Sequence, residues 1–285
     1  MSLLGRRHFL TLTAAALAAG VAPRRAGARP LDDVMADGRL RVAVYRDNPP
    51  FSYRDGGKLT GVDVDLGRVI AERLGVKVDY MELTAGETVF DDLRNAVWKG
   101  HYLGGGVADV MMHVPYEREF GLRNPEAVLF GPYQRENFAL ARNPMRVTQP
   151  MLAALPDEPV GVEVDSIPDF FLLGAFGGRL RERIVHYTTV AEAVDALVKG
   201  EVSAVVATQS QIEGALGERV KNFPVTPVTF TGMLTSSWNI GMAVKDNSRD
   251  LAYAVGDVIT ATIEDGTLDR IFQRYGVTRN AVPTE

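Results

Sequence analysis

Cysteine is absent from the sequence of 285 residues, and only four histidines are present. The lack of cysteine excludes disulfide bonds, thiolate metal sites and a cysteine nucleophile. The histidines His8, His101, His113 and His186 stand far apart in the chain, so they do not form a clustered metal-binding pattern. We therefore expect neither a metal site nor another cofactor.

A long apolar run is also lacking. Residues 9–22 are apolar but fall short of the roughly 20 residues that a membrane-spanning helix needs. Arg6-Arg7 precedes this run and Ala26-Gly27-Ala28 follows it, as in an export signal, and the arginine pair with the next three residues resembles a twin-arginine signal. We predict a signal peptide over residues 1–28 and a mature chain in the periplasm. An ordinary secretory signal and a retained membrane anchor are the alternatives.

Positive charge is in short supply. The formal net charge is −5, and removal of residues 1–28, which hold four arginines and no acidic residue, changes it to −9. An acidic surface argues against binding of nucleic acid, which needs basic patches. The remaining chain of about 257 residues has room for one or two domains.

The mature sequence alternates between strand patterns and helix patterns. The first unit has predicted strands at 39–45, 76–83, 107–112 and 136–141 and predicted helices at 61–74 and 90–98. After a connector at 143–150, the second unit has predicted strands at 159–164, 184–187, 204–207 and 240–244 and predicted helices at 167–176, 190–198, 212–216, 251–264 and 268–275. Such alternation predicts an α/β protein with a mostly parallel sheet that helices cover on both faces.

Six motifs follow one another along the mature chain: RLRVAVYRDNPPFSY, KLTGVDVDLGRVIAERLGV, VADVMM, GPYQRENFALARN, PVGVEVDSIPDFFL and WNIGMAVKDN with the helices after it. In this order they resemble the periplasmic solute-binding proteins of ABC transporters, in the polar amino-acid-binding group called solute-binding protein family 3. Each motif alone is weak, and the resemblance rests on their order over nearly the whole mature chain.

The resemblance implies a type II periplasmic binding protein fold, in which two α/β lobes are joined by two crossing strands near 135–142 and 236–243. It places lobe 1 at 31–137 and 239–285, and lobe 2 at 138–238. A small polar or anionic organic solute is expected to bind between the lobes, which close on it and deliver it to an ABC permease in the membrane. The resemblance implies no enzymatic activity. The ends of strands in α/β sheets also favour such a site, since ligands gather at their carboxyl ends.

The turn after the first strand holds the first candidate site residues. Two prolines restrict this turn, so we expect Tyr45, Asn48 or Phe51 to face the cleft with little conformational entropy left to lose on binding. Packing of Phe51 against the following helix is the alternative. Asp63 and Asp65 are expected to serve the free N–H groups at the start of that helix.

The other candidates lie where the chain departs from the family pattern. His113 stands where the family has a small hydroxyl residue. As a ligand-binding residue it can donate to an anion or join a metal, and a hydrogen-bonded structural role is the alternative. Arg118 and Arg123 compete for the role of the arginine that holds a carboxylate with its bidentate fork. Ser166 takes the place of a Gly-Thr or Gly-Ser turn. Thr208 replaces the aspartate that pairs with an α-ammonium; because a threonine cannot neutralise that charge, an ordinary α-amino acid is not the expected solute.

Parts of the sequence also bear on two further classes of function. Ser166, His113 and an aspartate can be combined into a triad, but no G-x-S-x-G elbow is present, so we expect no enzyme. The stretch ADVMMHVP also resembles the binding-protein homologues associated with quinoprotein alcohol dehydrogenases. Under that alternative the cleft binds a periplasmic dehydrogenase or its cytochrome instead of a transported solute. A rise in melting temperature with a solute distinguishes the two roles.

Overall fold

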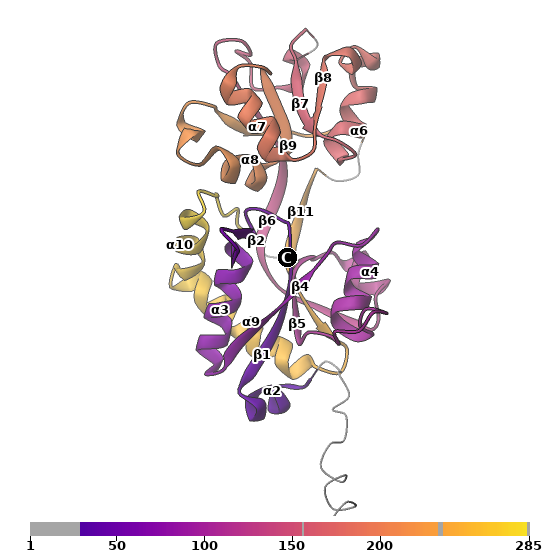
Figure 1. Ribbon diagram of the computed structural model, residues 1–285, viewed down its shortest axis with the longest axis vertical. Coiled ribbons are helices and arrows are strands. Elements are labelled where there is room, and N and C mark those ends of the chain that lie inside the picture. The colour runs from indigo at the N-terminus through magenta and orange to yellow at the C-terminus, as the bar shows by residue number, and fades with distance from the viewer. Residues whose placement is uncertain (1–28, 156, 233–235, 284–285) are drawn as a thin grey trace, which may run out of the picture.

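The computed structural model describes residues 29–155, 157–232 and 236–283, so the predicted signal peptide at 1–28 lies outside the described residues. The described chain forms two bodies stacked along the long axis of the molecule (Figure 1). In these described ranges, no helix combines the length and the apolar character that crossing a membrane requires.

Lobe 1 is the lower body in Figure 1 and consists mainly of the first part of the chain and its C-terminal helices. Its strands are β1 (Arg39–Tyr45), β2 (Tyr53–Asp55), β3 (Lys58–Thr60), β4 (Lys77–Leu83) and β5 (Val110–Pro115). Its helices are α2 (Leu31–Asp37), α3 (Val62–Leu74), α4 (Val89–Leu93), the π-helix η1 (Arg94–Trp98), α5 (Arg118–Leu122), α9 (Arg249–Glu264) and α10 (Thr267–Arg274).

Lobe 2 is the upper body and comes from the middle of the chain. Its strands are β7 (Val160–Glu163), β8 (Ile184–Tyr187), β9 (Ala204–Thr208) and β10 (Val225–Pro227). Its α-helices are α6 (Ile167–Gly174), α7 (Val190–Lys199) and α8 (Gln209–Leu216). Its 3-10 helices are η2 (Leu152–Ala154), η3 (Ala175–Gly178), η4 (Arg181–Arg183) and η5 (Gly217–Lys221).

Two long strands connect the lobes, β6 (Ala127–Arg142) and β11 (Ser237–Lys245). The strand order through the molecule is β4-β1-β5-β11-β6-β9-β7-β8, with β10 also paired to β6. β6 pairs with β11 over its first part and with β9 over its last part, so the same strand belongs to the sheets of both lobes. The predicted two-lobed fold with two crossing strands is confirmed.

The expectation of a mostly parallel sheet is wrong around the crossing strands. β1 is parallel to β4 and β5, and β7 is parallel to β8 and β9, as α/β units require. β11 is antiparallel to β5 and β6, and β6 is antiparallel to β9 and β10. The physical reason is that the crossing strands run in opposite directions through the hinge, without the helical crossover that makes neighbouring strands parallel.

Each lobe has apolar cores on the two faces of its sheet. In lobe 1, one core gathers residues of α3, α9 and α10 against β1, and the other gathers residues of η1 against β5. In lobe 2, one core lies under α6 and the other under α7 and α8. Sheets covered by helices on both faces are what the strand and helix patterns predict.

Several elements differ from the sequence prediction. The helix expected at 90–98 is α4 followed by the π-helix η1, and the hairpin of β2 and β3, the helix α5 and the strand β10 were not predicted. The strand expected at 136–141 is the last third of the much longer β6. The predicted lobe bounds, with lobe 2 at 138–238, stay a prediction.

The segment after α10 makes a third connection between the lobes. The amide N–H of Thr278 donates to a Glu213 carboxylate oxygen on α8, at 2.7 Å. The side-chain amide of Asn280 donates to Gln209 of α8 at 3.2 Å, and its backbone N–H donates to Gln134 of β6 at 2.9 Å. The C-terminal segment of lobe 1 is therefore fixed to both the hinge strand and a lobe 2 helix.

The turn between β1 and β2 closes over the start of α3. Carbonyl oxygens of Pro50 and Phe51 accept the backbone N–H groups of Val62 and Asp63, at 3.1 and 2.8 Å. Gly61 makes this contact possible: its φ is +127°, and a Cβ atom there would lie 2.2 Å from the Phe51 carbonyl oxygen. The position of the turn relative to α3 therefore requires glycine.

We predict that Gly61→Ala destabilises the protein by about 3 kcal/mol or more, because the new methyl group displaces the turn from the helix. Gly75→Ala is the matched control, since Gly75 also has positive φ, +74°, but nothing within 4 Å of an added Cβ. It should cost only about 1 kcal/mol. Urea denaturation of both variants checks the difference, and equal losses would contradict the steric argument.

Candidate functional site

The lobe 1 half of the cleft is a cavity of about 370 Å³ at the carboxyl end of β1. Three of the predicted residues line it together: Tyr45, Asn48 and His113. Asp47 lines it as well and was not predicted. The cavity lies where loops follow parallel strands, the usual location of ligand sites in α/β sheets.

Tyr45 is held in place by a buried carboxylate. Its hydroxyl donates to Asp92 Oδ2 at 2.8 Å, and the other Asp92 oxygen accepts the Gly86 N–H at 2.7 Å. Burial, together with the Asp92 charge, raises the pKa of the Tyr45 phenol far above its usual range. The residue therefore presents a neutral, fixed ring to the cavity.

His113 lies at the floor of the same cavity in a conformation that is rare for a residue with a side chain, with φ at +60°. The Phe51 ring packs against it, with the ring centroids 4.3 Å apart. The Nδ1 atom of His113 is 3.3 Å from Asp63 Oδ2, close enough for an ion pair when the imidazole is protonated, but the two atoms are not aligned for a hydrogen bond. The side chain of His113 is 19% exposed and lines the cavity.

Asp63 and Asp65 do not use their carboxylates to cap α3, as was expected. No side chain caps the N-terminus of this helix, where carbonyl oxygens of the preceding turn already accept N–H groups. The Asp63 carboxylate is fully buried and accepts the Tyr133 hydroxyl at 2.6 Å. Asp65 accepts Arg68 at 2.6 Å, and also accepts Arg274. Both carboxylates therefore accept hydrogen bonds from residues far away in the sequence, and not from the helix N–H groups that they were expected to cap.

The lobe 2 half of the cleft is a cavity of about 250 Å³ that Ser166 and Thr208 line together. Both are helix caps: Ser166 accepts the Asp169 N–H at the start of α6, and Thr208 accepts the Gln211 N–H at the start of α8. The Thr208 hydroxyl also donates to the Gln211 side chain at 2.7 Å. The capping role explains why short hydroxyl residues stand at these positions.

Sequence reasoning missed several residues of this second cavity. Phe138 and Trp238, one on each crossing strand, form an aromatic pair with ring centroids 5.0 Å apart. Glu163 at the end of β7 and Gln211 of α8 supply polar groups. The position of Glu163, the last residue of a strand just before a helix cap, was the signal that was available in the sequence.

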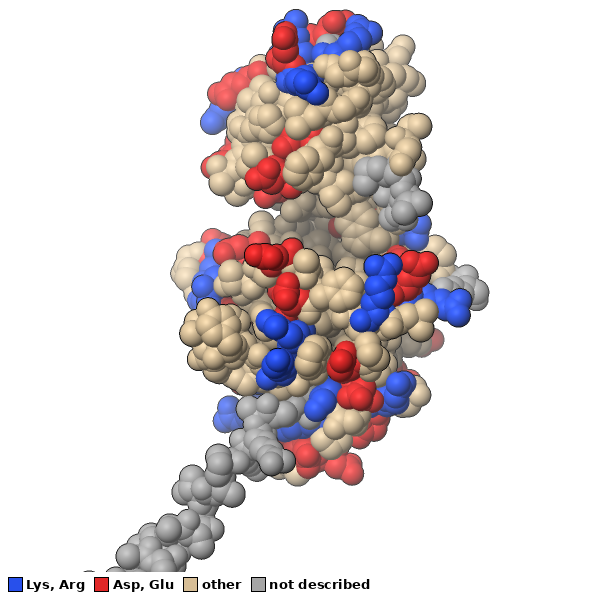
Figure 2. Space-filling model, turned by 90° about the vertical axis from the view of Figure 1, so that its right-hand side faces the viewer, with Lys and Arg blue, Asp and Glu red and all other residues tan. Residues whose placement is uncertain are grey.

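The two halves are connected through a larger cavity of about 980 Å³. It shares Asp47 with the lobe 1 half, and it shares Glu163, Val190 and Gln211 with the lobe 2 half. In Figure 2 a deep indentation separates the two bodies, with acidic side chains visible on both sides of it. Five of the seven predicted residues therefore line one continuous cleft between the lobes. The three residues on lobe 1 and the two on lobe 2 line different parts of this cleft.

The remaining two predicted residues lie elsewhere. Phe51 is 2% exposed and lies behind His113, in the core of lobe 1. Arg118 is exposed at the start of α5 and lines none of the cavities described above. Arg123 is exposed as well and pairs with Glu119 at 3.2 Å. In this open arrangement neither arginine contributes to the cleft, and their assignment as site residues stays a prediction.

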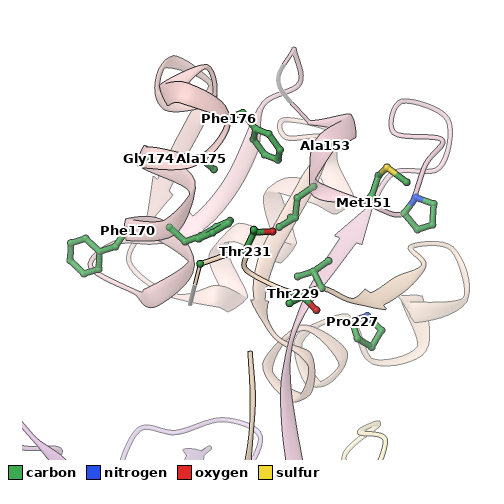
Figure 3. A pocket seen from close by; sticks show the side chains of 14 residues that line it. Met151, Ala153, Phe170, Gly174, Ala175, Phe176, Pro227, Thr229 and Thr231 are labelled. Atoms are coloured by element: carbon green, nitrogen blue, oxygen red, sulfur yellow. The ribbon is translucent and has the colours of Figure 1, made fainter. Parts of the chain in front are cut away.

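A separate cavity of about 930 Å³ lies within lobe 2, between α6 and the segment after β10 (Figure 3). Its lining is mostly apolar, with Met151, Phe170 and Phe176 among its side chains, and its polar side chains are the hydroxyls of Thr229 and Thr231. It contains none of the predicted residues. Since polar solutes are fixed by charged and hydrogen-bonding groups, the cleft between the lobes is the better candidate site.

Other observations bear on chemistry in the cleft. Ser166 and His113 line different halves, and the Ser166 hydroxyl donates to the Glu163 carbonyl at 2.7 Å, so the triad considered from the sequence is not assembled in this structure. Within the described ranges, no three histidine, aspartate or glutamate side chains are grouped to hold a metal ion.

Comparison with known proteins finds similarity to solute-binding proteins. Residues 40–99 match the family described as bacterial extracellular solute-binding proteins, family 3. The L-cystine-binding protein TcyJ of Escherichia coli strain K12 is 26% identical over 278 residues, which are 95% of this chain and 96% of that protein. Cyclohexadienyl dehydratase of Pseudomonas aeruginosa is 38% identical over 73 residues, 25% of this chain and 27% of that protein.

Solved structures show the same fold. An ancestral cationic amino acid solute-binding protein has a TM-score of 0.66 at 23% identity, over 86% of this chain and 99% of that chain. An amino acid ABC transporter substrate-binding protein from Streptococcus pneumoniae, bound to L-arginine, has a TM-score of 0.59 at 20% identity, over 88% and 99%. The predicted resemblance to family 3 is confirmed, whereas the likeness to the dehydrogenase-associated proteins stays a prediction.

We predict that Tyr133→Phe destabilises the protein by about 1–3 kcal/mol, because it leaves the fully buried Asp63 carboxylate without its hydroxyl donor. Tyr253→Phe is the control, since Tyr253 is 72% exposed on α9 and should change stability by less than about 0.5 kcal/mol. Chemical denaturation measures both. A Tyr133→Phe protein as stable as the control would show that the hydroxyl is not needed.

A second prediction concerns Glu136, a buried carboxylate on the hinge strand. Burial raises its pKa above the ordinary value of 4.5, against the effect of the Ser210 hydrogen bond. The folded state therefore binds the proton more tightly than the unfolded state, and stability falls as pH rises from about 4.5 through the raised pKa. The Glu136→Gln protein should lack this loss. Its melting temperature relative to the unchanged protein should rise between about pH 5 and about pH 8, and a constant difference would contradict the prediction.

Proposed function

We propose that this protein captures a small polar or anionic organic solute between its two lobes in the periplasm and delivers it to an ABC permease. The observation that carries the proposal is the continuous cleft, with Tyr45, Asn48 and His113 on one lobe and Ser166 and Thr208 on the other. A cavity of this size, polar on both sides and mounted on a hinge, suits a ligand that is enclosed when the lobes close.

The relatives support this role. TcyJ carries the name of an L-cystine-binding protein and is similar to nearly the whole chain, so a small zwitterionic solute fits the same general plan. His113 is suited to an anionic group, because it lines the lobe 1 half of the cleft and an imidazole N–H can donate to an anion. Export to the periplasm rests on the signal predicted at 1–28.

We further infer that the protein transports its solute without transforming it. Ser166 and Thr208 use their hydroxyls to cap helices, and each donates its hydroxyl hydrogen to an amide carbonyl oxygen, whereas an activated nucleophile donates to a base. The likeness to a dehydratase covers 73 residues, a quarter of this chain.

The two tryptophans of the chain allow a direct test. Trp238 lines the lobe 2 half of the cleft, whereas Trp98 packs in the core of lobe 1. In a Trp98→Phe protein, we predict that a bound solute changes the fluorescence of Trp238 and, at a hundredfold excess over Kd, stabilises the protein by about 2.7 kcal/mol. In the matched Trp238→Phe protein, the fluorescence of Trp98 should stay constant.

The screen should include amino acids, carboxylates and alcohol-oxidation products, with X-ray scattering to follow closure of the lobes. A solute that stabilises the protein and makes it more compact supports the proposal. If none of these solutes binds, and the protein is instead retained on an immobilised quinoprotein dehydrogenase, the proposal fails in favour of the accessory role.

A further inference from the structure

Glu163 is a half-buried carboxylate in the centre of the cleft. It ends β7 and lines both the lobe 2 half and the larger cavity that connects the two lobes. Within the part of the chain that the structure describes, its carboxylate has no hydrogen-bond donor and no cation as a partner. Burial accordingly raises the pKa of Glu163 above its ordinary value.

The basic residues around the cleft do not neutralise this carboxylate. Arg54 pairs with Glu82, and Arg274 pairs with Asp65. Arg46 lines the lobe 1 half of the cleft and is exposed to solvent. Lys221, which also lines the connecting cavity, is exposed to solvent. A carboxylate that is removed from water and left without a cation is unfavourable unless something else supplies the charge.

The surroundings of Glu163 favour a positive group. Phe138 and Trp238 line the same small cavity, and the face of an aromatic ring attracts a cation. Thr208 lines this cavity too, but its hydroxyl already has partners, because it caps α8 and donates to Gln211. Among the residues that line this half-site, Glu163 is thus the one whose side chain can carry a full charge.

We propose that Glu163 selects the solute by pairing with a positively charged nitrogen, an ammonium or a guanidinium, when the lobes close. This inference rests on the proposed function, and it adds to that function the chemical class of the solute: an organic molecule with a cationic nitrogen as well as an anionic or polar group. It also explains how the cleft can hold a positive charge although a threonine stands at position 208.

Closure of the lobes strengthens this pairing. In the open arrangement Glu163 is partly exposed, so solvent screens its charge. Closing the cleft removes water, and the attraction between two opposite charges rises as the local dielectric constant falls. A neutral solute of the same shape would bury Glu163 without that compensation, and its binding would be weaker for that reason.

The test measures binding by calorimetry with matched pairs of probes. Each pair joins a compound that has a cationic nitrogen with a neutral analogue: arginine with citrulline, alanine with lactate, and 4-aminobutyrate with 4-hydroxybutyrate. The first pair tests a guanidinium at the end of the solute, the second an α-ammonium, and the third a distant ammonium. The unchanged protein should bind the cationic member of at least one pair at least about tenfold more tightly than its analogue, a factor that corresponds to about 1.4 kcal/mol.

Two glutamine variants locate the effect. Glu163→Gln should weaken binding of that cationic solute at least about tenfold and remove the preference over its neutral analogue. Glu218→Gln is the matched control, because Glu218 lines the same connecting cavity but is exposed, and it should change the affinity by less than about twofold. The melting temperature of Glu163→Gln without solute should equal or exceed that of the unchanged protein, which shows that the variant is folded.

The outcomes separate this inference from the function on which it rests. If the unchanged protein binds a solute but prefers the neutral or purely anionic compounds, or if Glu163→Gln binds the cationic solute as tightly as before, the role of Glu163 is overturned and solute binding stands. If the unchanged protein binds no solute of either kind, the proposed function falls, and this inference falls with it.

Discussion

The buried carboxylate of Asp63 connects the parts of the molecule on which the cleft depends. The backbone N–H of Asp63 donates to the carbonyl of Phe51, and this hydrogen bond joins α3 to the turn after β1. One carboxylate oxygen accepts the Tyr133 hydroxyl of β6, and the other lies 3.3 Å from His113. A fully buried charge is tolerated only where such partners are fixed in place. The floor of the lobe 1 half-site and the strand that crosses into lobe 2 are therefore held by the same group.

The hinge has more connections than the two strands that define the fold. Besides β6 and β11, the segment at 278–280 is bonded to α8, and a Cβ atom on Gly214 of that helix would lie 2.9 Å from Pro50 of lobe 1. The lobes thus already touch near α8, while the two half-sites lie on different lobes. Under the proposed function, closure is expected to occur by rotation about the crossing strands, with the contacts near α8 limiting its directions.

The sequence predicts more of the fold than of the site, for physical reasons that particular residues illustrate. Periodic apolar residues located α3, α7 and α9 to within a residue or two, because burial of one face of a helix is a local pattern. The restricted turn after β1 pointed to Tyr45 and Asn48, and the resemblance to the family pointed to Ser166 and Thr208. All four line the cleft. Sequence reasoning did not find the partners of Asp65 or the pairing of Phe138 with Trp238, since these contacts join residues that are far apart in the chain. A carboxylate in the first turn of a helix favours a capping role only as long as no tertiary partner competes for it.

The structure shows which of the residues that depart from the family pattern are exposed to solvent and which are partly buried in the cleft. The arginine expected to hold a carboxylate is represented by Arg118 and Arg123, which are exposed, and the acid expected to hold an ammonium is replaced by Thr208, which caps a helix. Charges at the rim of a cleft are screened by water and salt and contribute little to affinity. His113 on one lobe and Glu163 on the other are ionisable cleft residues that are only partly exposed. Under the proposed function, recognition depends on where a charge is sheltered from solvent, and charged residues counted from the sequence alone do not reveal it.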